Sequence, residues 1–210
     1  MNEILLGLKN TFSIVAMTLA IGIPLGAFLA LAIDSNSFMK KPASLYVSFF
    51  RSTPLMLVLL GFYLVAPGLL KSLFGIKGDI RLFTAMLGFT LFEAAYFAGH
   101  FLSGLNAVSE EQKKSAKAQG LSTFQTFKHI TLPQAFKNCL PSTIGQGVIL
   151  FQDTTTVVAI GLADFYGKIV FVNEKAGHNT EGILIATFIY LSISLLGMWM
   201  VDKFKQQNHE

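Results

Sequence analysis

Long stretches without charged side chains are the feature that most constrains how this chain can fold. Residues 11–33 and 52–70 carry no charge, and the chain as a whole is only 13% charged, about half of the roughly 25% usual in soluble domains. A helix that rises about 1.5 Å per residue needs roughly 20 apolar residues to cross roughly 30 Å of hydrocarbon. Because backbone polar groups must be paired inside lipid, such stretches favour helices. The sequence therefore predicts an all-α integral membrane protein.

Five transmembrane helices are expected within a single transmembrane domain over residues 1–210. Their predicted bounds are about 11–33, 52–70, 82–105, 134–160 and 182–203. The second helix begins at Pro54, which suits a first helical turn after Ser52 or Thr53 as the cap. The fourth is expected to be interrupted near Asp153, where a charge and three threonines enter an apolar segment.

The orientation follows from the distribution of Lys and Arg. An odd number of spans places the two termini on opposite sides of the membrane, and cytoplasmic loops are enriched in Lys and Arg. The orientation with the N-terminus outside and the C-terminus in the cytoplasm puts most of these residues on the cytoplasmic side.

The segment 109–132 is the longest polar stretch on the predicted cytoplasmic side. Ser109 and Ser122 are each followed three residues later by glutamine, which matches the capping box, and Gly120 suits a left-handed turn between two short helices. The second of these helices carries an apolar stripe of Leu121, Phe124, Phe127 and Ile130. This stripe either packs against the ends of the chain's own helices or binds a partner protein.

The same segment resembles the EAA loop of the permease subunits of bacterial ABC importers. The resemblance rests on Ala116, Gly120 and the run Ile130-Thr131-Leu132-Pro133, although Lys114 and Ser115 replace the usual Glu and first Ala. In that family the loop docks into a groove of the cytoplasmic ATPase. The resemblance assigns ATPase coupling to Ala116, Gly120, Leu121, Ser122, Phe124, Ile130, Leu132 and Pro133.

Further motifs are similar to polar amino acid permeases of the type I importer class. They are Phe50-Arg51-Ser52-Thr53-Pro54-Leu55, Phe92-Glu93-Ala94-Ala95-Tyr96, Leu132-Pro133-Gln134-Ala135-Phe136 and Phe151-Gln152-Asp153-Thr154. Within the histidine/glutamine/glutamate permease family, the likeness is greatest to the glutamate/aspartate permease subunits. Gly99 and Leu102 stand where that family usually has Glu and Arg, which favours a heterodimer with a second permease subunit over a homodimer.

This resemblance also implies the partners and the location. They are a cytoplasmic ABC ATPase dimer that binds ATP and Mg, a second permease subunit, an extracytoplasmic amino acid binding protein and membrane lipid, in the bacterial inner membrane. The chain itself is expected to bind no cofactor. The segment from Gly161 to Lys168 resembles a phosphate-binding loop but does not match it. Five residues rather than four separate Gly161 from Gly167, and Ile169 replaces the Ser/Thr. The chain is therefore expected to rely on a partner for ATP hydrolysis.

Ionisable and polar groups inside the apolar segments are the candidates for the substrate pathway. Asp153 either caps a half-helix whose amides face a cavity or is a plain N-cap. Gln152 offers a donor and an acceptor without a fixed charge. Glu93 either lines the pathway or pairs with a neighbouring helix. The expected pathway residues are Gln152, Asp153, Thr154, Thr155 and Glu93.

Other polar residues are expected to be structural. Arg51 is interpreted as an interfacial anchor beside Thr53 and Pro54, because its stem can extend toward the membrane surface. His100 has no second ligand at metal-binding spacing, and no metal site is expected. Cys139, the only cysteine, is expected to be a small buried hydrophobe.

Three other functions are disfavoured. A free-standing secondary transporter or channel usually has an internal repeat, which five spans cannot form evenly. A membrane enzyme would need a catalytic set of residues that the sequence does not display. Nucleic-acid binding would need a basic stripe, whereas the basic residues are scattered between apolar blocks. Glutamate or aspartate is the expected substrate, and glutamine is the alternative.

Overall fold

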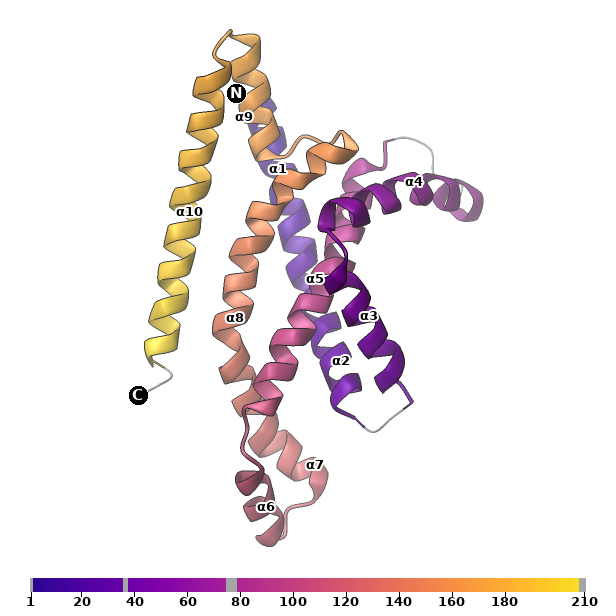
Figure 1. Ribbon diagram of the computed structural model, residues 1–210, viewed down its shortest axis with the longest axis vertical. Helices are drawn as coiled ribbons and strands as arrows, with labels where there is room; N and C mark the ends of the chain where they lie inside the picture. Colours follow the sequence, from indigo (N-terminus) through magenta and orange to yellow (C-terminus); the bar gives the residue numbers. More distant parts are fainter. Residues whose placement is uncertain (1, 36–37, 75–78, 208–210) are drawn as a thin grey trace.

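The computed structural model describes residues 2–35, 38–74 and 79–207, and every element in these ranges is helical (Figure 1). The α-helices are α1 (Asn2–Met17), α2 (Ile23–Asp34), α3 (Lys40–Ser52), α4 (Leu55–Phe74), α5 (Arg81–Asn106), α6 (Glu110–Ala118), α7 (Thr123–Thr126), α8 (Leu132–Asp153), α9 (Phe165–Lys175) and α10 (Asn179–Gln207). Two π-helical turns, Thr18–Gly22 and Phe127–Thr131, and one 3-10 helix, Thr154–Ile160, continue these helices.

Three helices among the described residues are long and apolar enough to cross a membrane on their own. They are Asn2–Asp34, Arg81–Asn106 and Thr180–Gln206. Two bent pairs pass the same test together: Lys40–Ser52 with Leu55–Leu69, bent by 107°, and Thr123–Ile160 with Phe165–Lys175, bent by 58°. The fold thus provides up to five spans if each bent pair counts as one.

The helices extend beyond the bounds expected from the sequence. The first begins at Asn2 rather than near residue 11, because α1 continues past the charged Lys9 and packs against α9. Helices α3 and α9 were not expected at all. Thr53, one of the two caps expected at the start of the second helix, instead donates its hydroxyl to the Phe49 carbonyl oxygen of α3, at 2.8 Å.

Helix α5 is the central element of the fold. In its apolar window 61% of the residues are buried, against 11% for the peripheral α10. Glycines let neighbouring helices approach it closely, as in other membrane proteins. A Cβ on Gly26 of α2 would lie 2.6 Å from Phe97 Cβ, and one on Gly104 would lie 2.5 Å from the Ala135 carbonyl oxygen of α8. The main apolar core forms around Phe89 and Leu59.

Two parts of the fold lie at opposite ends of its long axis. Helices α6 and α7 project below the ends of α5 and α8, whereas the N-terminus lies at the other end, beside α9 (Figure 1). The C-terminus of α10 points toward the same end as α6 and α7. This arrangement separates the hairpin of α6 and α7 from the loop at residues 161–164, which follows the 3-10 helix.

Candidate translocation site and coupling segment

The interruption expected near Asp153 is a change of helix type. Helix α8 ends at Asp153, and the backbone then tightens into the 3-10 helix Thr154–Ile160. Each of the three threonine hydroxyls donates to the carbonyl oxygen three residues before it, at 2.8–2.9 Å. These side-chain bonds stabilise the tight turn by satisfying carbonyl groups that a 3-10 helix pairs poorly.

An open hollow of about 350 Å³ lies between this segment and α10, and its lining mixes polar side chains with a larger apolar surface. Its lining includes Gln152 and Thr155 together with the aromatic rings of Tyr166 and Tyr190. The Gln152 amide nitrogen donates to the Ser194 hydroxyl of α10 at 2.6 Å, which holds the side chain in the lining of this hollow. Two of the five residues expected in the pathway therefore share one depression. Its other lining residues are Ala186, Thr187 and Leu191.

The capping role expected for Asp153 is wrong. The residue has helical backbone angles (φ −65°, ψ −20°) and makes no side-chain capping bond. A capping side chain needs extended angles to reach back to the amides of the first turn. Among the described side chains, none donates a hydrogen bond to the half-buried Asp153 carboxylate.

Asp164 is the aspartate that does cap a helix, and the sequence analysis missed it. Its carboxylate is fully buried, accepts from the Gly167 amide at 2.8 Å at the start of α9, and accepts from the Tyr190 hydroxyl at 3.0 Å. The Tyr190 ring also stacks on Phe151, with 4.8 Å between the ring centroids. Tyr190 therefore joins α8, α9 and α10 around the hollow. An aspartate directly before an aromatic-rich helix was the available signal.

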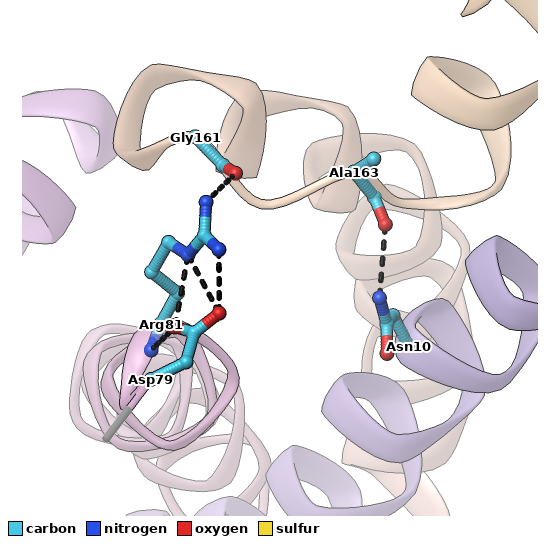
Figure 2. A network of polar contacts seen from close by, with 5 residues as sticks. All are labelled: Asn10, Asp79, Arg81, Gly161 and Ala163. Carbon is cyan, nitrogen blue, oxygen red and sulfur yellow. Dashed lines mark hydrogen bonds and ion pairs between the residues drawn. The ribbon is translucent and has the colours of Figure 1, made fainter. Parts of the chain in front are cut away.

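The loop between the 3-10 helix and α9 is held from two sides (Figure 2). Arg81 of α5 donates to the Gly161 carbonyl oxygen at 2.6 Å, and Asn10 of α1 donates to the Ala163 carbonyl oxygen at 2.9 Å. Asp79 accepts from the Arg81 guanidinium, which lowers the pKa of that carboxyl to about 2. Gly161 has φ +70°, a left-handed conformation that ends the 3-10 helix.

Glu93 lies away from the hollow, on the central helix α5. Its side chain is fully buried and accepts from the Gln146 amide of α8 at 2.9 Å. The Gln146 oxygen lies 3.3 Å from Nε2 of His100, so these three side chains form a chain between α5 and α8. The second carboxylate oxygen of Glu93 has no partner among the described residues. Glu93 therefore pairs between helices and is not brought together with Gln152.

Arg51 lies at the end of α3, where the chain turns toward α4 through Thr53 and Pro54. Its guanidinium carbon is 5.6 Å from the centroid of the Tyr96 ring of α5, a cation–π arrangement. The Pro54 carbonyl oxygen accepts from Leu57 and Val58 and so begins α4. The side chain of Arg51 is thus placed on the central helix.

The polar segment 109–132 begins with the short helix α6 (Glu110–Ala118), as the sequence predicts. The second helix is not separate, because α7 continues through the π-helical turn into α8 as one helix over Thr123–Ile160. Gly120 has φ +90°, and Ser122 and Gln125 form a complete capping box, so both predictions are confirmed. At Ser109 only half of the box forms: its hydroxyl accepts from the Gln112 amide at 3.3 Å. Lys113 donates to Glu110, which lowers the pKa of that carboxyl.

The apolar stripe of this segment divides between two surroundings. Phe127 packs against the core cluster of Ala135 and Cys139, whereas Phe124 is 71% exposed. Leu121 and Ile130 face α6 across a hollow of about 410 Å³. Packing against the chain's own helices thus holds for Phe127, whereas Phe124 is left exposed. Ala116 is buried in the hairpin, while Leu132 and Pro133 begin α8.

Within residues 2–35, 38–74 and 79–207, no three His, Cys, Asp or Glu side chains gather closely enough to hold a metal ion.

Comparison with known proteins decides the family. Residues 22–208 match the family described as the binding-protein-dependent transport system inner membrane component. The chain belongs to this family. It is therefore a multi-pass inner membrane component of a transport system, and its long apolar helices are membrane spans.

Individual relatives in this family are amino acid permeases. The chain is 40% identical over 204 residues to the glutamate/aspartate import permease protein GltK of Escherichia coli O157:H7. This match covers 96% of this chain and 91% of GltK. It is 33% identical to the arginine transport system permease protein ArtQ of Bacillus subtilis, over 92% of this chain and 86% of ArtQ.

Solved structures share the fold over almost the whole chain. A crystal structure of an amino acid ABC transporter with histidines matches with a TM-score of 0.85 at 25% identity, covering 98% of this chain and 94% of the other. The inward-facing MetNI methionine ABC transporter matches with a TM-score of 0.74 at 18% identity, covering 99% and 94%, which shows the fold alone. The all-helical permease fold is confirmed.

Proposed function

We propose that this family member is the permease subunit of an ATP-driven importer for glutamate and aspartate. The observation that carries the proposal is the 40% identity to a glutamate/aspartate import permease over 96% of this chain. The hollow beside Gln152 and Thr155 supports it, because these two residues offer amide and hydroxyl groups at a point where the helix changes type. Transporters commonly form substrate sites where membrane helices are interrupted.

The hairpin of α6 and α7 is the proposed docking element for an ABC ATPase dimer. Phe124 is the exposed part of the apolar stripe, and Leu121 and Ile130 line an open hollow beside it. An amphipathic helix that projects from a membrane domain buries such a face in a groove of its partner. ATP and Mg belong to that partner, and this chain contributes no ATPase of its own.

The proposed orientation places the N-terminus outside and the C-terminus and the hairpin in the cytoplasm, with five spans. Figure 1 supports it, because the N-terminus and the α6–α7 hairpin lie at opposite ends of the long axis. An extracytoplasmic binding protein then delivers the amino acid at the end that carries the loop 161–164. A second permease subunit completes the membrane unit, and a paralogue is favoured over a second copy because Gly99 and Leu102 replace charged residues of the family.

A competition assay tests the substrate assignment. The complete complex, with its binding protein, is reconstituted in liposomes, and the uptake of labelled glutamate is measured against unlabelled glutamate, aspartate and glutamine. Aspartate should compete about as well as glutamate, and glutamine should compete weakly. If glutamine competes better than both acidic amino acids, the assignment to glutamate and aspartate is wrong and the complex is a glutamine importer.

A further inference from the structure

The position of Arg51 is unusual for a side chain that only anchors a helix at the membrane surface. Helix α3 is docked on α5 by the Tyr46 hydroxyl, which donates to the Leu91 carbonyl oxygen at 2.6 Å, and by Phe50, which is buried in the main core. These contacts fix the last turn of α3 against the central helix. The guanidinium is consequently held over the Tyr96 ring rather than left free to extend along the surface.

Gly99 leaves the space into which the guanidinium fits. An added Cβ at Gly99 would lie 3.0 Å from Nη1 of Arg51, so the guanidinium rests against the backbone of α5. Any larger residue at position 99 would displace it or bond to it. The cation therefore lies on α5 one helical turn beyond Tyr96.

The guanidinium has no anionic partner within the described part of the chain. Glu93, the only acidic residue of α5, is turned toward α8 and accepts from Gln146 instead. Yet the side chain of Arg51 remains exposed in the isolated subunit. Arg51 lies at the bend of the candidate span formed by Lys40–Ser52 and Leu55–Leu69, and an arginine within a span almost always faces a pathway or a partner rather than lipid.

We propose that Arg51 binds a carboxylate of the transported amino acid during its passage. A guanidinium presents parallel N–H donors that match a carboxylate in a bidentate pair, and its planar face remains stacked on the Tyr96 ring in that arrangement. The proposal deepens the function proposed above and rests on it for the acidic class of substrate. In this proposal Arg51 of α3 supplies the cation that an anionic substrate requires.

Two matched pairs of substitutions test the proposal in the complete complex. Gly99→Glu places a carboxylate beside the guanidinium, whereas Gly99→Gln adds nearly the same bulk without charge. Arg51→Gln removes the cation, whereas Arg51→Lys keeps a positive charge. The measured quantities are the rate of labelled glutamate uptake at saturating substrate in reconstituted liposomes and the co-purification of the second permease subunit and the ATPase.

The expected result is that Gly99→Glu transports glutamate about tenfold or more slowly than Gly99→Gln, since a lost hydrogen bond to a charged group is commonly worth at least that factor. Arg51→Gln should likewise fall about tenfold below Arg51→Lys, with all four complexes assembled. Equal uptake within both pairs overturns the proposal, whether the shared rate is high or low. Selective loss of the second permease subunit from Gly99→Glu and Arg51→Gln also overturns it, because the carboxylate then belongs to that subunit.

Failure of the proposed function gives a different result. If the unsubstituted complex imports no acidic amino acid, the substrate assignment fails before any variant is compared. The two pairs are then measured with the amino acid that the complex does import, whose own carboxylate Arg51 is still expected to bind.

Discussion

The close approach of α5 and α8 at Gly104 yields a sharp test of the fold. A Cβ at this position would meet the Ala135 carbonyl oxygen at 2.5 Å and Cys139 Cβ at 3.0 Å. Ordinary van der Waals contact begins at 3.4 Å, so the two helices must separate by almost 1 Å. Gly61 of α4 is the matched control, because a Cβ there would meet nothing within 4 Å.

The expected magnitude follows from two opposing effects. Replacing glycine by alanine within a helix stabilises it by about 1 kcal/mol, and this applies to both positions. At Gly104 the added carbon also overpacks a rigid backbone contact, which typically costs about 1–3 kcal/mol. The Gly104→Ala protein should therefore unfold at a temperature about 2–12 °C below that of Gly61→Ala, at roughly 2–4 °C per kcal/mol for a chain of this size.

Cys139 supplies the assay. It is the only cysteine of the chain, is 3% exposed, and lies directly against Gly104. A maleimide dye that fluoresces on reaction with a thiol should label it only when α5 and α8 separate. Labelling during heating should begin at a lower temperature in Gly104→Ala than in Gly61→Ala. Identical labelling curves would refute the close packing of these helices.

Three further substitutions test the site and the coupling segment. Gln152→Ala should lower glutamate uptake several-fold without loss of assembly, because it removes the polar group bound to Ser194 at the hollow; uptake by the complete complex measures this. Phe124→Asp should abolish substrate-stimulated ATP hydrolysis, since it places a charge in the apolar face proposed to dock the ATPase. Gln146→Leu should lower the free energy of unfolding by about 1–2 kcal/mol, because it leaves the buried Glu93 carboxylate without its donor; thiol labelling of Cys139 measures this.

Each of these substitutions has a control. Asp153→Asn keeps the size of its side chain and, since Asp153 caps no helix, should leave assembly unchanged. Phe124→Leu keeps an apolar group and should retain most of the ATP hydrolysis. The double substitution Glu93→Leu with Gln146→Leu removes the unpaired carboxylate as well and should be more stable than Gln146→Leu alone. Wild-type behaviour of Gln152→Ala, Phe124→Asp or Gln146→Leu would contradict the corresponding assignment.

The parts of this fold that depend on local sequence are predictable. The long apolar stretches give the membrane spans directly, because the thickness of the bilayer sets the length of a helix. The turn at Gly120 and the capping box from Ser122 to Gln125 involve only neighbouring residues, so their pattern is visible in the chain. Helix α3 is harder to predict, because its residues are too polar and too few for a span and its position depends on packing against α5.

The parts that depend on the register between distant helices are not predictable from one sequence. The pair of Glu93 and Gln146 is separated by 53 residues, and only the packing of α5 on α8 brings it together. Asp153 and Asp164 both precede helical turns, but only Asp164 has the extended backbone that a cap requires. The stacking of Arg51 on Tyr96 likewise needs the docking of α3, which the sequence does not reveal.

Uptake of labelled glutamate by the complete complex in liposomes tests the central claim most directly. We predict accumulation inside the liposomes that requires both the binding protein outside and ATP on the side of the ATPase, and that stops when either is left out. Accumulation by this chain without the ATPase, or an ATP-dependent complex that moves neither glutamate nor aspartate, would contradict it.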